Sequence, residues 1–100
     1  MAKVRKSSAG SGYVDLIGRI YTGSIRVDKE GKKFLNECSN KIWFDSHWNS
    51  WKYQDKQIKT TLSKKIYSVM NRIPIDKING KIVFINKDKS DFRLKNLKVN

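Results

Sequence analysis

The dipeptide Asn79-Gly80 constrains the fold of this chain more than any other short stretch. It stands between two β-rich runs, residues 75–78 and residues 81–85. Both central residues of a type I′ turn need a positive φ angle, which Asn and Gly tolerate best. The pair therefore predicts a tight β-hairpin near the end of the chain.

A polar loop and a short helix are predicted to follow this hairpin. Ser90 or Asp91 can cap a helix that carries Arg93 and Asn96, because short polar side chains satisfy the first free N–H groups of a helix. The predicted order of residues 74–99 is therefore hairpin, loop and helix.

This order and these residues resemble the ββα core of HNH nucleases, especially the phage and intron homing enzymes. The resemblance covers about a quarter of the chain. Eight residues match the family core as they stand: Ile85, Asn86, Asp88, Asp91, Arg93, Asn96, Leu97 and Val99. Most of them hold the loop and the helix together in the family, so the resemblance implies an HNH-like scaffold over residues 74–99.

The departures from the family fall on its chemistry. There, an Asp-His pair supplies a metal ligand and the general base, and an Asn before the Arg lies on the metal side. These positions hold Val83, Phe84 and Phe92 in this chain. A phenyl ring can neither accept a proton nor bind a hard divalent cation. The resemblance thus implies a nuclease scaffold without its catalytic residues, and we expect no catalytic residue, metal or other cofactor.

Composition limits the size of the protein and points to its partner. The chain has 100 residues, enough for one small domain, with 22 Lys and Arg against 9 Asp and Glu and a net charge of +13. Such an excess repels itself and favours a polyanionic partner, so nucleic acid is expected. The single cysteine, Cys38, excludes an internal disulfide and favours a reducing compartment. Because no apolar run is long enough to span a membrane, we expect no membrane contact and a cytoplasmic location, the host cytoplasm if the chain is phage-encoded.

The first half of the chain is predicted to be an arm and a β-meander. Residues 1–12 are small, polar and basic without periodicity, which indicates a flexible basic arm. From Tyr13 onward short β-rich runs alternate with polar breaks, and residues 34–38 and 41–44 are further strand candidates. We predict that residues 13–100 form a single compact domain that opens with an antiparallel meander of three or four strands.

Residues 55–72 are predicted to form one long amphipathic helix. Ile58, Leu62, Ile66 and Val69 are spaced by four, four and three residues, which places them on one helix face. Pro74 should end this helix, since the residue before a proline is disfavoured in α geometry. The predicted fold class is therefore α+β: a meander, one long helix, and a degenerate ββα unit.

Aromatic residues concentrate between this meander and this helix. Trp43, Phe44, Trp48, Trp51 and Tyr53 lie within eleven residues. A small domain uses large rings to build its core, so we expect most of them inside and one or two on a binding face.

Three functions remain open, of which we favour a non-catalytic nucleic-acid-binding protein derived from an HNH nuclease, with DNA favoured over RNA. The first alternative is a protein-binding inhibitor of a host enzyme or complex. A divergent metal-dependent nuclease is the third function, and an RNA-binding version of the first also remains open. The candidate nucleic-acid-binding residues are Lys77, Lys81, Lys87, Lys89, Arg93, Lys95, Lys98, Lys64, Lys65 and Arg5.

Overall fold

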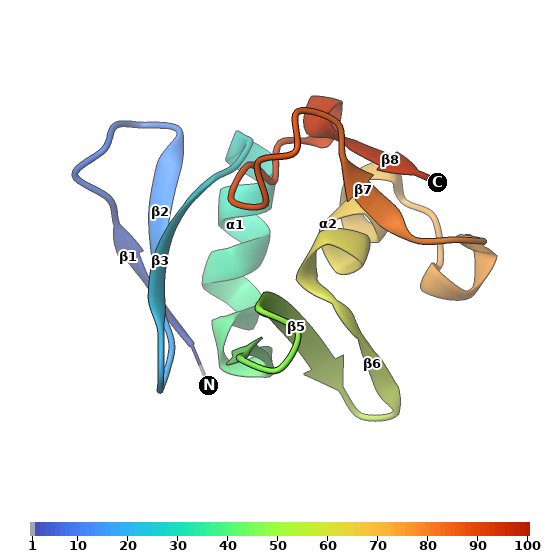
Figure 1. The fold of residues 1–100 in the computed structure, drawn as a ribbon, viewed down its shortest axis with the longest axis horizontal. Coiled ribbons are helices and arrows are strands. Elements are labelled where there is room, and N and C mark those ends of the chain that lie inside the picture. The colour runs from blue at the N-terminus through green and yellow to red at the C-terminus, as the bar shows by residue number, and fades with distance from the viewer. Residues whose placement is uncertain (1) are drawn as a thin grey trace.

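The computed structural model describes residues 2–100 as three small antiparallel sheets and two helices (Figure 1). Helices α1 (Lys29–Cys38) and α2 (Leu62–Asn71) lie in the middle, with one sheet on one side and two sheets on the other. The chain is α+β, but strands dominate. The predicted fold of one long helix followed by a C-terminal hairpin and helix is wrong.

The first sheet contains β1 (Lys3–Lys6), β2 (Tyr13–Ile17) and β3 (Thr22–Arg26) in that order. The period-two alternation of β2 puts Val14 and Leu16 on the core face, where both are fully buried. Ile25 of β3 is directly opposite Val14 and joins them.

Residues 3–6 belong to this sheet, and residues 2–6 are not part of a flexible arm. The N–H of Ala2 donates to the carbonyl of Ile42 at 2.8 Å, and Ala2 is buried. Lys3 to Lys6 pair antiparallel with β2. This pairing satisfies the backbone groups that β2 would otherwise leave open along its edge, which explains why a polar, basic segment is ordered.

Residues 34–38 lie in helix α1 and not in a second meander strand. Gly31, Phe34 and Leu35 are buried, at the three- and four-residue spacing of one helix face. Asp28 occupies the N-cap position, so the helix begins directly after β3 and a short link. A short 3₁₀ turn, Ser39–Lys41, then leads into the next strand.

The second sheet replaces the first part of the predicted long helix. It contains β4 (Ile42–Asp45), β5 (Ser50–Asp55) and β6 (Ile58–Thr61), paired in that order. The β5–β6 turn includes Lys56, whose φ of 56° is incompatible with a helix. Ile58, predicted to begin the apolar helix stripe, lies instead in β6 and is 46% exposed.

Helix α2 begins seven residues later than predicted and ends close to the predicted place. The Thr61 hydroxyl caps it by accepting a hydrogen bond from the N–H of Lys64 at 3.2 Å. Leu62 and Ile66 are fully buried. The helix ends with Arg72 in the left-handed region, at a φ of 55°, two residues before Pro74.

The third sheet pairs β7 (Ile82–Phe84) with β8 (Leu97–Val99), so the predicted hairpin across Asn79-Gly80 is wrong. Residues Ile75–Lys77 form a 3₁₀ turn, and the predicted short helix that carries Arg93 and Asn96 is only the 3₁₀ turn Leu94–Asn96, which leads into β8. Gly80 does adopt a positive φ, 120°, but for another reason. A Cβ there would lie 2.5 Å from the backbone oxygen of Asn100, so the glycine allows β7 and the chain end to approach.

One core connects the three sheets. It includes Val14, Leu16, Leu35, Ile42 and Ile66 with the rings of Phe34, Trp51, Tyr53 and Phe92. Of the clustered aromatics, Trp51 and Tyr53 are thus internal, while Trp48 is 66% exposed.

Candidate functional site

Four lysines from four parts of the chain line a single groove. They are Lys52 in β5, Lys59 in β6, Lys64 in α2 and Lys81 just before β7. The groove has a volume of about 530 Å³. Its other lining residues are Asp45, Trp48, Thr60, Thr61, Gly80 and Ile82. We call this feature the lysine groove.

Local structure explains how the four amines converge. In β5 the residues Trp51 and Tyr53 point into the core, so Lys52 between them points outward. Gln54, on the same outward face, is directly opposite Lys59 of β6. Lys64 lies in the first turn of α2. The backbone of Lys81 is held in place because its carbonyl accepts a hydrogen bond from the N–H of Asn100 at 2.8 Å.

The lysine groove keeps its positive charge uncompensated. The ion pairs in residues 2–100 join Arg5 to Asp15, Lys41 to Asp55 and Arg93 to Asp91, and none includes a groove lysine. The one acid of the lining, Asp45, accepts hydrogen bonds from the N–H groups of His47 at 3.0 Å and Trp48 at 3.4 Å. The groove thus has four ammonium groups and one carboxylate, of which one oxygen, Oδ1 of Asp45, already accepts two hydrogen bonds.

Aromatic rings flank these amines. The Nζ of Lys52 lies 5.9 Å from the ring centroid of Trp48, and the Nζ of Lys59 lies 5.9 Å from that of Trp43. The ring of His47 packs edge-on against Trp48, with centroids 5.0 Å apart. Exposed Trp48 is therefore held beside the groove by its own loop, where it can stack on a planar ligand.

The ten binding residues predicted from the sequence lie in different environments in the structure. Lys64 and Lys81 lie in the lysine groove. Arg5 and Arg93 are instead engaged with carboxylates, since Arg5 Nη2 lies 2.8 Å from Asp15 and lowers the pKa of that acid. The Nζ of Lys65 sits 5.0 Å from the ring centroid of Tyr53. The remaining five, all exposed outside the groove, are Lys77, Lys87, Lys89, Lys95 and Lys98.

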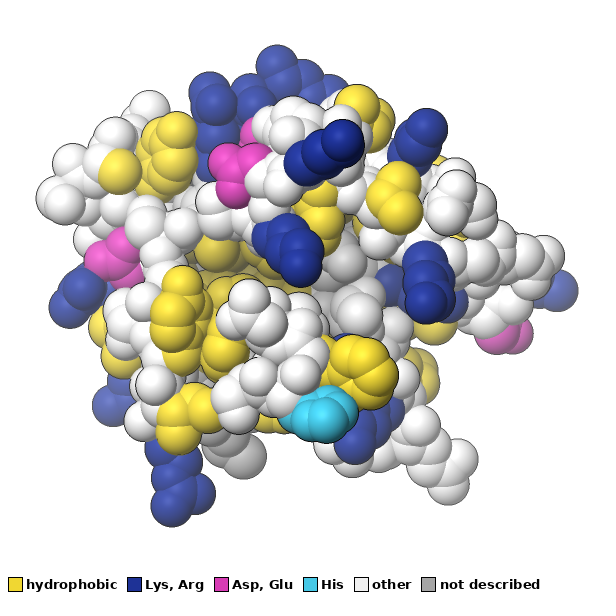
Figure 2. All heavy atoms as spheres, in the orientation of Figure 1, with side chains coloured by type: hydrophobic (Ala, Val, Ile, Leu, Met, Phe, Trp, Pro, Cys, Tyr) yellow, Lys and Arg dark blue, Asp and Glu magenta, His cyan; other side chains and the backbone are white. Residues whose placement is uncertain are grey.

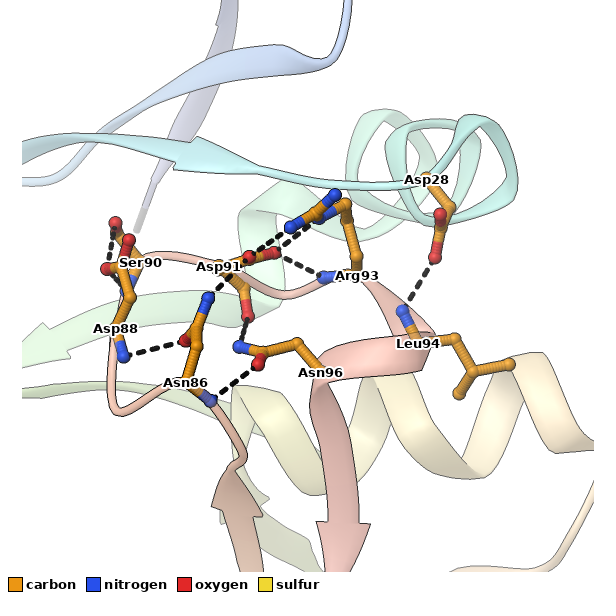
Figure 3. Close-up of polar contacts among 8 residues, drawn as sticks. All are labelled: Asp28, Asn86, Asp88, Ser90, Asp91, Arg93, Leu94 and Asn96. Atoms are coloured by element: carbon orange, nitrogen blue, oxygen red, sulfur yellow. Dashed lines mark hydrogen bonds and ion pairs between the residues drawn. The ribbon is translucent and has the colours of Figure 1, made fainter.

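Arg93 belongs to a partly buried network that shapes the loop between β7 and β8 (Figure 3). Its Nε and Nη2 donate to the carboxylate of Asp91 at 2.8 and 2.6 Å, and Asp91 is only 2% exposed. These hydrogen bonds, with a further one from Asn86, hold the pKa of Asp91 at about 2. The predicted phosphate-binding role of Arg93 is not supported by this geometry, because its guanidinium already has a partner.

Asn96 completes this network and ties both ends of the loop together. Its Nδ2 donates to the carbonyl of Asp91 at 3.0 Å, and its Oδ1 accepts from the N–H of Asn86 at 2.8 Å. The N–H of Leu94 donates to the carboxylate of Asp28 at 2.7 Å, which fixes the loop against the start of α1 (Figure 3). These polar groups position the loop and leave little capacity for a ligand.

Sequence reasoning missed Lys52, Lys59 and Trp48 as site residues. Lys59 falls within the helix predicted for residues 55–72, and Lys52 lies in an aromatic stretch for which no strand is predicted from the sequence. The alternation of Trp51, Lys52 and Tyr53 could have indicated it, because buried and exposed positions alternate along a strand.

Residues 2–100 contain neither a cluster of metal ligands nor a membrane-spanning helix. Among residues 2–100, no three His, Cys, Asp or Glu side chains come together in a way that could hold a metal ion. Neither helix of the described chain is long and apolar enough to cross a membrane. Comparison with known proteins finds no matching family model, no similar curated protein and no similar solved structure.

Proposed function

We propose that this chain is a non-catalytic nucleic-acid-binding protein, with DNA favoured over RNA, and that it holds phosphates in the lysine groove. The observation that carries the proposal is the convergence of Lys52, Lys59, Lys64 and Lys81 from separate elements without a carboxylate partner. Like charges repel, so such a cluster costs folding free energy. A polyanion that enters the groove removes this cost.

The charge of the whole chain supports the same partner. With a net charge of +13, the protein attracts a polyanion from a distance, and the groove provides a defined place for it. Each phosphate neutralised by a lysine releases condensed counterions into solution. Four such contacts give a slope of log affinity against log salt of about −3.6 on duplex DNA and about −2.8 on a single strand.

Packing at the positions of the family's catalytic residues supports a role without catalysis. Phe84 and Phe92, which stand at two of these positions, pack edge to face with ring centroids 5.3 Å apart. Phe92 is 3% exposed and belongs to the core. The residues that match the HNH core, including Asn86, Asp91, Arg93 and Asn96, make the loop network. Both features fit the proposed descent from an HNH nuclease, a lineage that acts on DNA.

The proposal is tested by fluorescence-anisotropy titration of duplex DNA, single-stranded DNA and RNA at two salt concentrations, with Mg²⁺ present. The same samples are analysed on a gel for cleavage. We expect salt-sensitive binding, tighter for DNA than for RNA, with the nucleic acid intact. Cleavage would contradict the non-catalytic role. No binding at low salt would contradict the proposal as a whole and would favour a protein partner.

A further inference from the structure

A second cavity, which we call the aromatic pocket, lies next to the lysine groove. Its volume is about 270 Å³, slightly below the range typical for drug-sized ligands. Rings from two sides line it: Tyr21, Phe44 and Trp51 on one, and Phe84 and Phe92 on the other. Figure 2 shows hydrophobic side chains gathered near the middle of the face in view, with Lys and Arg side chains around them.

The rings of this pocket are fixed by mutual packing, and part of their surface remains accessible. The centroids of Tyr21 and Phe44 are 4.3 Å apart, and those of Phe44 and Trp51 are 5.2 Å apart. Tyr21 is 48% exposed although it packs on both other rings. A Cβ on Gly23 would lie 2.9 Å from the Tyr21 ring, so a larger residue at this position would displace the ring. The pocket is thus pre-formed to contact a flat, apolar surface.

Polar groups stand at the same pocket. Its lining includes Ser24, Asn49, Ser50, Ser63, Lys89 and Ser90. In the described chain, the side chains of Asn49 and Lys89 form no hydrogen bond or ion pair. A ligand with a flat apolar face and a polar edge therefore fits this lining better than an aliphatic one, because rings offer stacking and the amide offers hydrogen bonds.

The aromatic pocket and the lysine groove are adjacent, because they share two lining residues. Thr61 and Ile82 line both cavities. A ligand that enters both must join an anionic part to a flat aromatic part through a short link. A nucleotide has this construction, with its phosphate and its base joined by the sugar.

We infer that the aromatic pocket takes one unstacked nucleobase of a single strand whose phosphates lie in the lysine groove. This inference rests on the proposed function. It adds that the protein contacts a base only where that base is not paired. In a duplex the bases are stacked and cannot reach the pocket, so a single strand should bind more tightly than a duplex of equal length.

The test compares two strands of equal charge: an oligothymidylate of about 12 nucleotides and an abasic deoxyribose-phosphate oligomer of the same length. Affinities of the unmodified protein are measured by competition at fixed salt. Stacking of one base should make the thymidylate bind about 5- to 150-fold more tightly. The same ratio is then measured for Trp48→Ala and Tyr21→Leu, with Ile20→Ala as the control, since Ile20 is 64% exposed and does not line the pocket.

We expect the ratio to persist in Ile20→Ala, to fall only partly in Trp48→Ala, because this ring flanks the groove, and to fall towards one in Tyr21→Leu. If the unmodified protein binds both strands with equal affinity and steep salt dependence, the inference is overturned. Phosphate binding in the lysine groove would not be contradicted by that result. Loss of the ratio in Trp48→Ala would also overturn it, since the base would then stack on the groove tryptophan. If neither strand binds at low salt, the proposed function itself fails. Trp48 is exposed, so its variant decides the matter even if Tyr21→Leu does not fold.

Discussion

The carboxylate of Asp91 and the guanidinium of Arg93 form a bidentate pair in which the acid is only 2% exposed. Paired geometry of this kind is among the strongest polar contacts in proteins, and its loss leaves a buried charge without a partner. The pair lies in the loop between β7 and β8, against the end of β3, where Arg26 and Asp91 form a parallel bridge. Backbone hydrogen bonds of Arg26 with Ser90 and Phe92, both at 2.7 Å, join this loop to the first sheet.

Asp91 should make the stability of the protein depend on pH in the acid range. Its folded-state pKa of about 2 lies below the ordinary value of 3.8, so its contribution is fully present above about pH 4 and is lost as the pH falls towards 2. The difference corresponds to about 2 kcal/mol of unfolding free energy. Asp91→Asn should lose about this amount at pH 7 and flatten the curve between pH 4 and 2, as measured by urea unfolding. Exposed Asp76→Asn is the control, and an equal effect of both substitutions would exclude a special role for Asp91.

Substitutions of Arg93 and Lys89 should distinguish the loss of the Asp91–Arg93 ion pair from the loss of one exposed positive charge. Arg93→Ala leaves the buried Asp91 carboxylate with Asn86 as its remaining side-chain partner, so we expect a loss of about 2 to 3 kcal/mol in unfolding free energy. Lys89→Ala removes an exposed amine and should change stability by less than about 0.5 kcal/mol. Chemical denaturation measures both. Equal stability of the two variants would show that the Asp91–Arg93 pair contributes little.

Thr61 should determine where α2 begins. Its hydroxyl accepts the N–H of Lys64, so Thr61→Ala should lower the unfolding free energy by about 1 kcal/mol. Thr61→Ser keeps the acceptor and should be close to neutral. The pair is compared by thermal unfolding. A serine variant as unstable as the alanine variant would mean that the Thr61 methyl group, and not the cap, matters.

Gly80 and Gly12 form a matched pair for a test of backbone conformation. Gly80→Ala would place a Cβ in a φ of 120° and 2.5 Å from the Asn100 oxygen, and should cost more than about 1 kcal/mol. Gly12 lacks a positive φ and has open space around it, so Gly12→Ala should be neutral or slightly stabilising. Denaturant midpoints measure both. Similar midpoints would contradict the close approach of β7 and the chain end.

Local pattern predicted strand character in β2 and β3 of the first sheet, because Val14 and Leu16 lie on either side of Asp15 and face the core, but it did not predict β1. The local pattern gave wrong predictions where the same short sequence is compatible with two different structures. The spacing of Ile58, Leu62 and Ile66 suits a helix, yet Tyr53 pairs with Thr60 across a hairpin, and this non-local contact removes Ile58 from the helix. Asn79-Gly80 likewise has turn chemistry, but β7 finds its partner in β8, about fifteen residues away, which no short-range pattern shows.

The sequence predicted the type of ligand for the candidate site but not the location of the site in the fold. The surplus of lysines indicated a polyanionic partner, and Lys64 and Lys81 were named from the sequence. Arg93 and Arg5 were also named, because a sequence does not show that Asp91 and Asp15 take up their charge. Lys52 and Lys59 reach the groove only through the pairing of β5 with β6, so the groove required the fold.

The most direct measurement is the salt dependence of DNA binding by two variants that each lose four positive charges. In one, Lys52, Lys59, Lys64 and Lys81 are replaced by Gln; in the other, Lys3, Lys6, Lys29 and Lys33 are replaced, all exposed and outside the groove. Each phosphate-binding lysine contributes about one unit to the slope of log affinity against log salt. We predict that the groove variant loses most of the slope and of the affinity, while the other variant keeps most of both. Equal losses in the two variants would contradict binding in the lysine groove and leave only a diffuse attraction to the whole surface.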